Sequence, residues 1–269
     1  MHNIYIRADK ISKQLSDKFY WHGYIDFYES FFASKRIENI AEFGVYKGKS
    51  ISWLLERFPH SQIYGADILP EQPEWPKDAR FKFTELNQAN VNEIRQFLSQ
   101  VSFDLIIEDG SHQPQHQINC LIEGLKALRP GGIYILEDID TSLPSHHWWH
   151  KKIHWWKFRE RKIYKEQKRV IGKGNALNAL LGIDHYKRLN IPVDQDVGKL
   201  IAKNSLIPEE VITEIANQID SLKLYRRTRL PDYCHSCGQT HFEYSKLECQ
   251  CGEKLFREAD SMSYLLIKK

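Results

Sequence analysis

The stretch from Phe103 to Asp140 constrains the fold of this chain more than any other. Two apolar runs, Asp104–Ile107 and Ile133–Leu136, each end in a cluster of acids. Short apolar runs of this kind predict buried strands of a parallel sheet. In open α/β sheets ligands bind at the carboxyl edge of the strands. The acids that follow both runs are therefore expected to converge on one site.

Four ionisable side chains stand at this expected edge, namely Asp109, His112, Glu137 and Asp138. Three carboxylates beside one histidine suit a hard divalent cation and a general base. Carboxylates that are buried without a cation or a partner would be costly. The alternative is that the acids begin a solvated loop or cap a helix, and that His112 packs at a helix terminus. A hydrolase built on Ser111 is disfavoured, because no Gly-x-Ser-x-Gly elbow is present.

A strand, a glycine turn and a helix precede this stretch. We predict a short strand at Ile40–Val45, a turn marked by Gly44 and Gly48, and a helix at Ser50–Phe58. Such a unit lets backbone amides approach a ligand closely. The glycine spacing is not the three-glycine dinucleotide fingerprint. A second predicted strand ends at Asp67, where an acid can accept hydrogen bonds from ribose hydroxyls. Together these features predict a nucleotide-type site.

With these motifs the chain resembles class I S-adenosylmethionine (SAM) methyltransferases. Among them it is similar to the metal-dependent sugar O-methyltransferases of macrolide and polyketide antibiotic pathways, the mycinamicin and elloramycin type. The resemblance covers most of the chain and is carried by SDKFYWHGYIDFYESFF, EFGVYKGKSISWLLERFPHSQIYGADI, EDGSH, PGGIYILEDID and IDSLKLYRR. In the first segment the similar residues are Asp17, Lys18, His22, Tyr24 and Tyr28. The chain departs from the family at Leu86-Asn87-Gln88, where relatives often have Gly-Asp-Gln, and at Glu108, where they often carry Asp.

The resemblance implies a seven-stranded Rossmann-like α/β sheet, SAM as cofactor, and Mg²⁺ or Mn²⁺ as metal. By position, the implied metal ligands are Asp109, Glu137 and Asp138. The implied catalytic residues are His112, as the base that takes the acceptor hydroxyl proton, and Asp109. The residues implied to surround SAM are Glu42, Gly44, Tyr46, Gly48, Ser50, Asp67, Asn87, Gln88 and Asp109.

Four cysteines near the carboxyl terminus form two close pairs a dozen residues apart, each followed by a glycine. They are Cys234, Cys237, Cys249 and Cys251. This spacing predicts a zinc ribbon, because thiolates suit zinc and four of them close a tetrahedral structural site. His235 and His241 are alternative ligands, and two disulfides are the alternative chemistry. The polar amino terminus shows no secretory signal. A reducing cytoplasm, where zinc is favoured over disulfides, is therefore expected.

The zinc ribbon has an expected place in the fold. We predict strands at Asp220–Arg226 and at Ser261–Ile267. In class I methyltransferases the last two strands form an antiparallel hairpin. The ribbon at 232–254 would then be a small insertion into that final hairpin.

A basic aromatic segment follows the predicted metal ligands. Ser145–Arg169 holds four of the seven tryptophans of the chain, and nine Lys or Arg residues against two Glu. Interleaved aromatics and cations can stack on a sugar ring and pair with an acidic group. We predict a lid over an acceptor, with an anionic glycan as one option. Single-stranded nucleic acid, a membrane surface, or an amphipathic helix with a solvated basic face are the alternatives.

Composition agrees with one soluble α/β core. The chain has 269 residues, with 42% hydrophobic and 27% charged residues, which is ordinary for a globular protein. The net charge of +3 is too small to require nucleic acid as partner. No run approaches transmembrane length. The predicted organisation is a helical cap at 1–36, a SAM-binding core at 37–142, the lid and helices at 143–219, and the final hairpin with its insert at 220–269.

The predicted function is magnesium-dependent O-methylation of a sugar hydroxyl on a glycan or glycosylated natural product. One alternative is an RNA or protein methyltransferase that grips its substrate with the ribbon and the basic aromatic segment. The other is a SAM-binding scaffold without turnover. The expected partners are a small-molecule or glycan acceptor and a second copy of the chain. The expected location is the cytoplasm.

Overall fold

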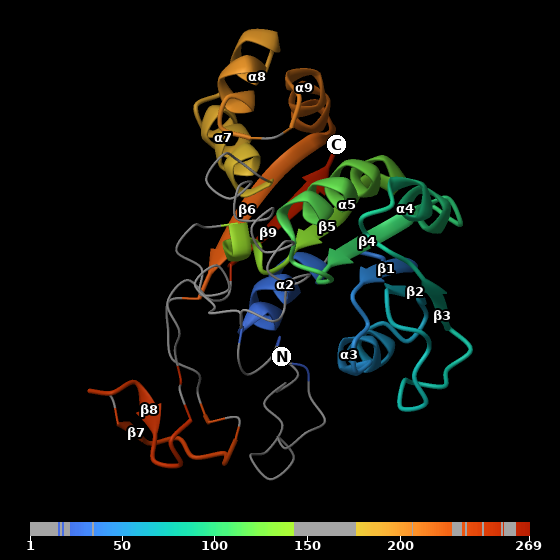
Figure 1. Ribbon diagram of the computed structural model, residues 1–269, viewed down its shortest axis with the longest axis vertical. Coiled ribbons are helices and arrows are strands. Elements are labelled where there is room, and N and C mark those ends of the chain that lie inside the picture. The colour runs from blue at the N-terminus through green and yellow to red at the C-terminus, as the bar shows by residue number, and fades with distance from the viewer. Residues whose placement is uncertain are drawn as a thin grey trace, which may run out of the picture.

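A seven-stranded sheet forms the centre of this computed structural model (Figure 1). The structure describes residues 16, 18, 22–33, 35–142, 176–205, 207–227, 233–234, 236–243, 245–253, 255 and 262–269. The strand order is β3-β2-β1-β4-β5-β9-β6. The strands are β1 (Asn39–Phe43), β2 (Gln62–Asp67), β3 (Phe81–Glu85), β4 (Phe103–Glu108), β5 (Leu128–Leu136), β6 (Ile219–Arg226) and β9 (Met262–Lys268). Strands β1 to β5 are parallel, and β9 runs antiparallel to both of its neighbours. The predicted fold class, a mixed α/β methyltransferase-like sheet, is confirmed.

Helices cover both faces of the sheet. They are α2 (Tyr24–Phe32), α3 (Lys49–Arg57), α4 (Val91–Leu98), α5 (Pro114–Ala127), α7 (Ala176–Arg188), α8 (Gln195–Ala202) and α9 (Glu209–Gln218), with a short 3₁₀ helix η2 (Ile139–Ser142). One apolar cluster joins the sheet to α2 and α3, and another joins it to α4, α5, α7 and α9. Along β5, Ile133 and Ile135 belong to the first cluster, whereas Tyr134 and Leu136 belong to the second. Both faces of this strand are therefore buried, which explains its unbroken apolar run.

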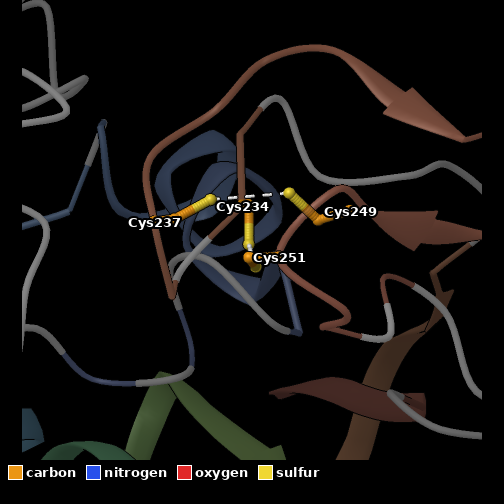
Figure 2. A group of neighbouring side chains, drawn as sticks. All are labelled: Cys234, Cys237, Cys249 and Cys251. Atoms are coloured by element: carbon orange, nitrogen blue, oxygen red, sulfur yellow. Dashed lines mark hydrogen bonds between the residues drawn. The ribbon is translucent and has the colours of Figure 1, made fainter.

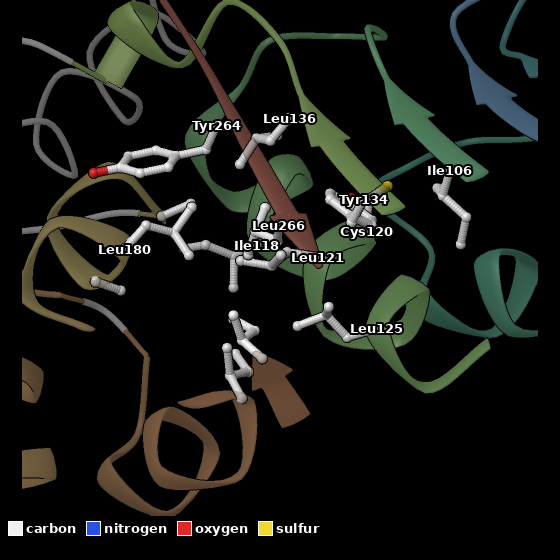
Figure 3. Packing of buried hydrophobic residues seen from close by; sticks show 14 of the residues in the cluster. Ile106, Ile118, Cys120, Leu121, Leu125, Tyr134, Leu136, Leu180, Tyr264 and Leu266 are labelled. Carbon is white, nitrogen blue, oxygen red and sulfur yellow. The ribbon is translucent and has the colours of Figure 1, made fainter. Parts of the chain in front are cut away.

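Helix α5 is the main cover of one face. In Figure 3 its side chains Ile118, Leu121 and Leu125 lie among residues of the central strands, including Tyr134 of β5 and Leu266 of β9. All five side chains are buried. Because α5 begins at Pro114, six residues after β4 ends at Glu108, this packing fixes the loop that carries His112.

Two element boundaries differ from the sequence prediction by more than one residue, each for a physical reason. Strand β1 ends at Phe43 and not at Val45, because Gly44 takes a positive φ of 93° that ends the extended backbone. Strand β5 begins at Leu128, five residues before the predicted start at Ile133. The Pro-Gly-Gly sequence at 130–132 interrupts the apolar run there, so the pattern does not reveal the early pairing with β4.

The final hairpin forms as predicted, with β6 and β9 paired in antiparallel register and Leu222 opposite Leu266. Between them in the chain, β7 (Phe242–Glu243) and β8 (Glu248–Cys249) form a separate two-stranded sheet. Figure 1 shows this small sheet apart from the central one. The four cysteines therefore belong to an insertion within the hairpin.

Several predictions fall on residues that the structure leaves out. The basic aromatic segment Ser145–Arg169, His235 and Asp17 lie outside the described residues, so the lid stays a prediction. The predicted domain boundaries also stay predictions. Among the described residues, no helix is both long and apolar enough to cross a membrane.

Candidate functional site

The acids that follow β4 and β5 meet at one edge of the sheet. Strands β4 and β5 are parallel neighbours, and the Glu137 amide donates to the Glu108 carbonyl at 2.9 Å. One ligand atom each of Asp109, His112 and Asp138 lies within 4.8 Å of the others. The Nε2 atom of His112 is 3.7 Å from Oδ2 of Asp138 and 4.0 Å from Oδ1 of Asp109. The convergence expected from two strand ends is thus present.

The backbone is strained at this site. Tyr46, His112 and Asp138 adopt left-handed φ values of 46°, 54° and 48°. Residues other than glycine rarely take this conformation, which costs on the order of 1–3 kcal/mol each. Such strain persists only where surrounding contacts impose it, and it concentrates at functional sites. Three of the five such residues in the described chain lie at positions that the sequence predicted for cofactor, base and metal.

A lysine without a predicted role, Lys18, lies inside the acid cluster. Lys18 is 1% exposed, and its Nζ bonds to the carboxylates of Asp109 and Glu137, at 2.7 Å to Oε2 of the latter. It also stands 3.7 Å from Oε1 of Glu42. Spacing could not reveal this contact, because Lys18 lies far from these residues in the sequence. The only available signal was its place in the first family-like segment.

Asp138 is held by the same amino-terminal region. Its Oδ1 accepts a hydrogen bond from the hydroxyl of Tyr24 at 2.8 Å and lies 3.8 Å from Nδ1 of His22. Burial alone would raise the pKa of Asp138, but His22 and His112 outweigh it and the pKa is lowered. Asp138 is therefore a carboxylate, the form in which it can hold a cation.

The same interactions raise the pKa of His112. Burial alone lowers the pKa of His112, but the carboxylates of Asp138 and Asp109 outweigh it, so its pKa lies above the ordinary value. A histidine with this basicity is suited to accept a proton. A further cation bound to the same carboxylates would weaken their stabilisation of the imidazolium form of His112 and so lower its pKa.

Two buried glutamates flank Lys18. Burial raises the pKa of Glu42 to about 7, and raises that of Glu137 well above its ordinary value, although Lys18 opposes both shifts. Oε2 of Glu42 and Oε1 of Glu137 have no hydrogen-bond partner among the described residues. Buried oxygens of this kind require a proton or a cation. The donor set thus fits a hard divalent ion, with oxygen ligands and local negative charge in excess.

The glycine loop after β1 is tied to the end of β2. The carboxylate of Asp67 accepts from the amides of Val45 and Tyr46 through Oδ2, both at 2.8 Å, and from the amide of Leu69 through Oδ1 at 2.9 Å. Each carboxylate oxygen accepts about two hydrogen bonds. Oδ1 therefore keeps one acceptor position, which is what a ribose hydroxyl needs.

Both glycines of the loop permit close approaches. A Cβ on Gly44 would lie 2.0 Å from the Asp109 carbonyl oxygen, and one on Gly48 would lie 2.9 Å from the Trp75 ring. The loop after β1 thus rests directly on the loop after β4. Tyr46 stands 65% exposed at the tip of the glycine loop. Ser50 is buried beneath it and donates its hydroxyl hydrogen to Glu42.

Gln88 and Asn87 differ in their surroundings. The Gln88 amide donates to Glu108 at 2.7 Å and accepts from the Ser111 amide at 2.8 Å, so it supports the loop that carries His112. The Asn87 side chain is exposed and accepts from the amide two residues ahead at 3.0 Å. Their predicted contacts with SAM stay predictions. The Ser111 hydroxyl pairs with Nδ1 of His116 at 2.7 Å.

The cysteines of the hairpin insertion come together in space (Figure 2). The sulfur atoms of Cys234 and Cys251 are 3.7 Å apart, those of Cys237 and Cys249 are 3.5 Å apart, and all four lie within 4.8 Å of one another. A disulfide would require about 2.05 Å. A tetrahedral zinc with Zn–S distances of about 2.3 Å gives S···S edges of about 3.8 Å. The observed sulfur spacing would fit a metal ion held by four cysteines, and it is too wide for two disulfides.

Comparison with known proteins identifies the central part of the chain. A family model described as a methyltransferase domain matches residues 41–139. This chain contains a methyltransferase domain. The matched range begins in β1 and ends in η2, so it spans the glycine loop, Asp67 and all the acids after β4 and β5.

Curated relatives of the methyltransferase domain are sugar O-methyltransferases by name. A tetracenomycin 3'-O-methyltransferase of Streptomyces olivaceus, named for a 2-methoxy-α-L-rhamnosyl substrate, is 29% identical over 49% of this chain. A rhamnosyl tetracenomycin 2'-O-methyltransferase of the same organism is 28% identical over 47%. The mycinamicin VI 2''-O-methyltransferase of Micromonospora griseorubida is 29% identical over 49%. These matches span about a third of each relative's length (36%, 36% and 35%).

Solved structures support the fold of the same domain. The MycE methyltransferase of the mycinamycin pathway, solved in complex with Mg and SAH, aligns with a TM-score of 0.50 and 20% identity. The alignment covers 74% of this chain and 46% of MycE. The structural alignment therefore covers more of this chain than the 49% matched by sequence.

Proposed function

We propose that this protein is a SAM-dependent O-methyltransferase that uses a divalent cation to act on a sugar hydroxyl of a glycosylated compound. One observation carries the proposal. The ligand atoms of Asp109, His112 and Asp138 lie within 4.8 Å of one another. The glycine loop after β1 contacts the backbone of Asp109 directly. The names of the relatives support a glycosylated acceptor.

Each part of the site would have a distinct task. The glycine loop and Asp67 would bind the nucleoside part of SAM, which supplies the methyl group. Asp109, Glu137 and Asp138 would hold the divalent ion, which when bound would lower the pKa of the acceptor hydroxyl. His112 would take the hydroxyl proton at Nε2, the nitrogen that faces the carboxylates. Contacts with Lys18, Tyr24 and the two histidines fix the positions of the acids, so alignment is the main contribution of the protein.

Replacing Asp67 by alanine is expected to weaken binding of S-adenosylhomocysteine at least tenfold. The substitution removes the acceptor for ribose and also releases the amides of Val45 and Tyr46 from their partner. Calorimetric titration with S-adenosylhomocysteine measures the change. Asp196→Ala is the matched control, because Asp196 is 91% exposed on α8. Equal affinities of wild type and Asp67→Ala would contradict the cofactor assignment, and no binding by wild type would overturn the proposed function.

The divalent-ion requirement and the acceptor class are tested by transfer of a labelled methyl group. Purified protein is incubated with labelled SAM and α-L-rhamnosyl aromatic polyketides, with Mg²⁺ and after chelation. Methylated product that disappears on chelation is the expected result. Product that is insensitive to chelation would contradict the metal role. Product with RNA or protein but none with glycosides would contradict the acceptor class.

We also propose that the four cysteines hold one structural Zn²⁺. The insertion has almost no apolar interior of its own, since its described cluster consists of Cys234, Cys249 and Leu255 with Phe242 packed against it. A segment this small needs a metal or disulfides to keep its shape. The sulfur spacing favours the metal, and a closed set of four thiolates leaves zinc no open position for catalysis.

Zinc content provides the check on this second proposal. The purified protein is expected to contain about one zinc per chain, and Cys237→Ser to contain less than half of that. Cys120→Ala is the matched control, because Cys120 lies on α5 outside the cluster and should leave zinc content unchanged. Elemental analysis gives the stoichiometry. A wild-type protein without zinc, or one with four oxidised cysteines by mass spectrometry, would contradict the assignment.

A further inference from the structure

Lys18 takes the place of a cation in the acid cluster. Its ammonium group lies between the carboxylates of Asp109 and Glu137, with Glu42 as a third acid at 3.7 Å. The lysine side chain is 1% exposed. Its partners come from β1 and from the residues that follow β4 and β5. A lysine from the amino-terminal region thus neutralises the ends of three central strands.

The acids of the cluster have different partners, and Lys18 contacts only some of them. Asp138 is contacted by His22, Tyr24 and His112, and it belongs with Asp109 to the set whose ligand atoms lie within 4.8 Å. Glu137 is absent from that set, and its Oε2 is occupied by Lys18. Two of the three acids proposed to hold the divalent ion are therefore engaged by an internal monovalent cation.

A divalent ion at these carboxylates must contend with the ammonium group. Two cations that share the same carboxylate oxygens repel each other strongly here, because Lys18 and Glu137 are buried and little solvent screens their charges. The oxygens without partners on Glu42 and Glu137 show that one lysine does not satisfy all of the negative charge. The cluster can therefore accept more positive charge, but only after Lys18 withdraws from at least one carboxylate.

We propose that Lys18 is a tethered competitor of the divalent ion. It holds Asp109 and Glu137 when the ion is absent, and it lowers the affinity of the site for the ion. Loading of the metal then displaces Lys18 from these carboxylates. This inference rests on the proposed divalent site and adds a positioning residue that sets the affinity of that site.

The test compares Mn²⁺ binding by calorimetry in variants of Lys18. Lys18→Gln keeps a hydrogen-bond donor but removes the charge, and its Kd for Mn²⁺ is expected to fall at least tenfold. Lys18→Arg keeps the charge and is expected to stay within threefold of wild type. Lys35→Met is the matched control, because Lys35 is a part-buried lysine that bonds to the Gly131 carbonyl away from the acids. Unchanged or weaker Mn²⁺ binding by folded Lys18→Gln overturns the proposal.

A second measurement uses the wild-type protein and does not depend on the folding of a variant. Reductive methylation of lysines is followed by mass spectrometry with and without saturating Mn²⁺. The modification rate of Lys18 is expected to rise at least fivefold with the ion, and that of Lys35 to stay constant. An unchanged rate for Lys18 overturns the proposal. S-adenosylhomocysteine binding in the same samples reports separately on the cofactor site, so failure of the proposed function is distinguishable.

Discussion

His112→Asn is expected to lower the rate of methyl transfer by about 10²–10⁴-fold while leaving the affinity for S-adenosylhomocysteine unchanged. Asparagine lacks a basic nitrogen but tolerates the left-handed φ of 54° at this position. The backbone of the loop is therefore kept, and the change removes only the group that takes the proton. Single-turnover rates with labelled SAM and a rhamnosyl acceptor measure the effect.

A neighbouring histidine controls for general damage to the loop. His116 lies four residues further along, pairs with Ser111 at 2.7 Å, and is not part of the cluster formed by Asp109, His112 and Asp138. His116→Asn should retain transfer within about threefold of wild type, far less than the loss expected from removing a general base. Full turnover by His112→Asn would show that another group, or the solvent, accepts the proton. Loss of cofactor binding in His112→Asn would show that the residue is structural.

Gly44→Ala is expected to destabilise the methyltransferase domain by about 2–5 kcal/mol and to abolish binding of S-adenosylhomocysteine. The added methyl group would lie 2.0 Å from the carbonyl oxygen of Asp109, a backbone atom that cannot rotate away. Alanine is also disfavoured at the φ of 93° found there. Relief of the clash must separate the glycine loop from the loop after β4. Chemical denaturation and calorimetric titration measure the two effects.

Gly131→Ala separates the clash from the backbone preference. Gly131 has a similarly positive φ of 75°, but the nearest atom to an added Cβ is Nζ of Lys35 at 3.9 Å. Only the conformational cost of about 1 kcal/mol is expected there, with cofactor binding intact. Equal stability losses in Gly44→Ala and Gly131→Ala would contradict the predicted clash between the glycine loop and the carbonyl of Asp109.

The central strands could be predicted because their signal is local. The apolar runs of β4 and β5 reflect burial on both faces, and the acids that follow them mark the edge where the chain turns. The cysteine pairs are equally local, since the two cysteines of each pair lie two or three residues apart in the sequence. The start of β5 at Leu128 could not be predicted, because the Pro-Gly-Gly sequence around Gly131 is typical of a turn and not of a strand.

The arrangement of charges within the site could not be predicted in the same way. The sequence places Glu137 and Asp138 next to each other, but the left-handed backbone of Asp138 directs the two carboxylates to different partners. One meets Lys18 and the other meets Tyr24 and two histidines. Such contacts depend on how the amino-terminal region packs across the sheet, which neither spacing nor periodicity encodes.

The order of strands has a consequence for how the chain folds while the ribosome synthesises it. Strand β9 is synthesised last, yet it lies between β5 and β6 in the sheet. The hydroxyl of Tyr24 bonds to the Met262 carbonyl of this strand, and the hydroxyl of Tyr28 bonds to that of Ser263. At about 5–20 residues per second, roughly 6–25 s separate the synthesis of Leu136 from that of Met262. Throughout that interval one edge of β5 lacks its partner and is open to wrong pairings. The contacts of Tyr24 and Tyr28 with β9 can form only once the final strand has emerged.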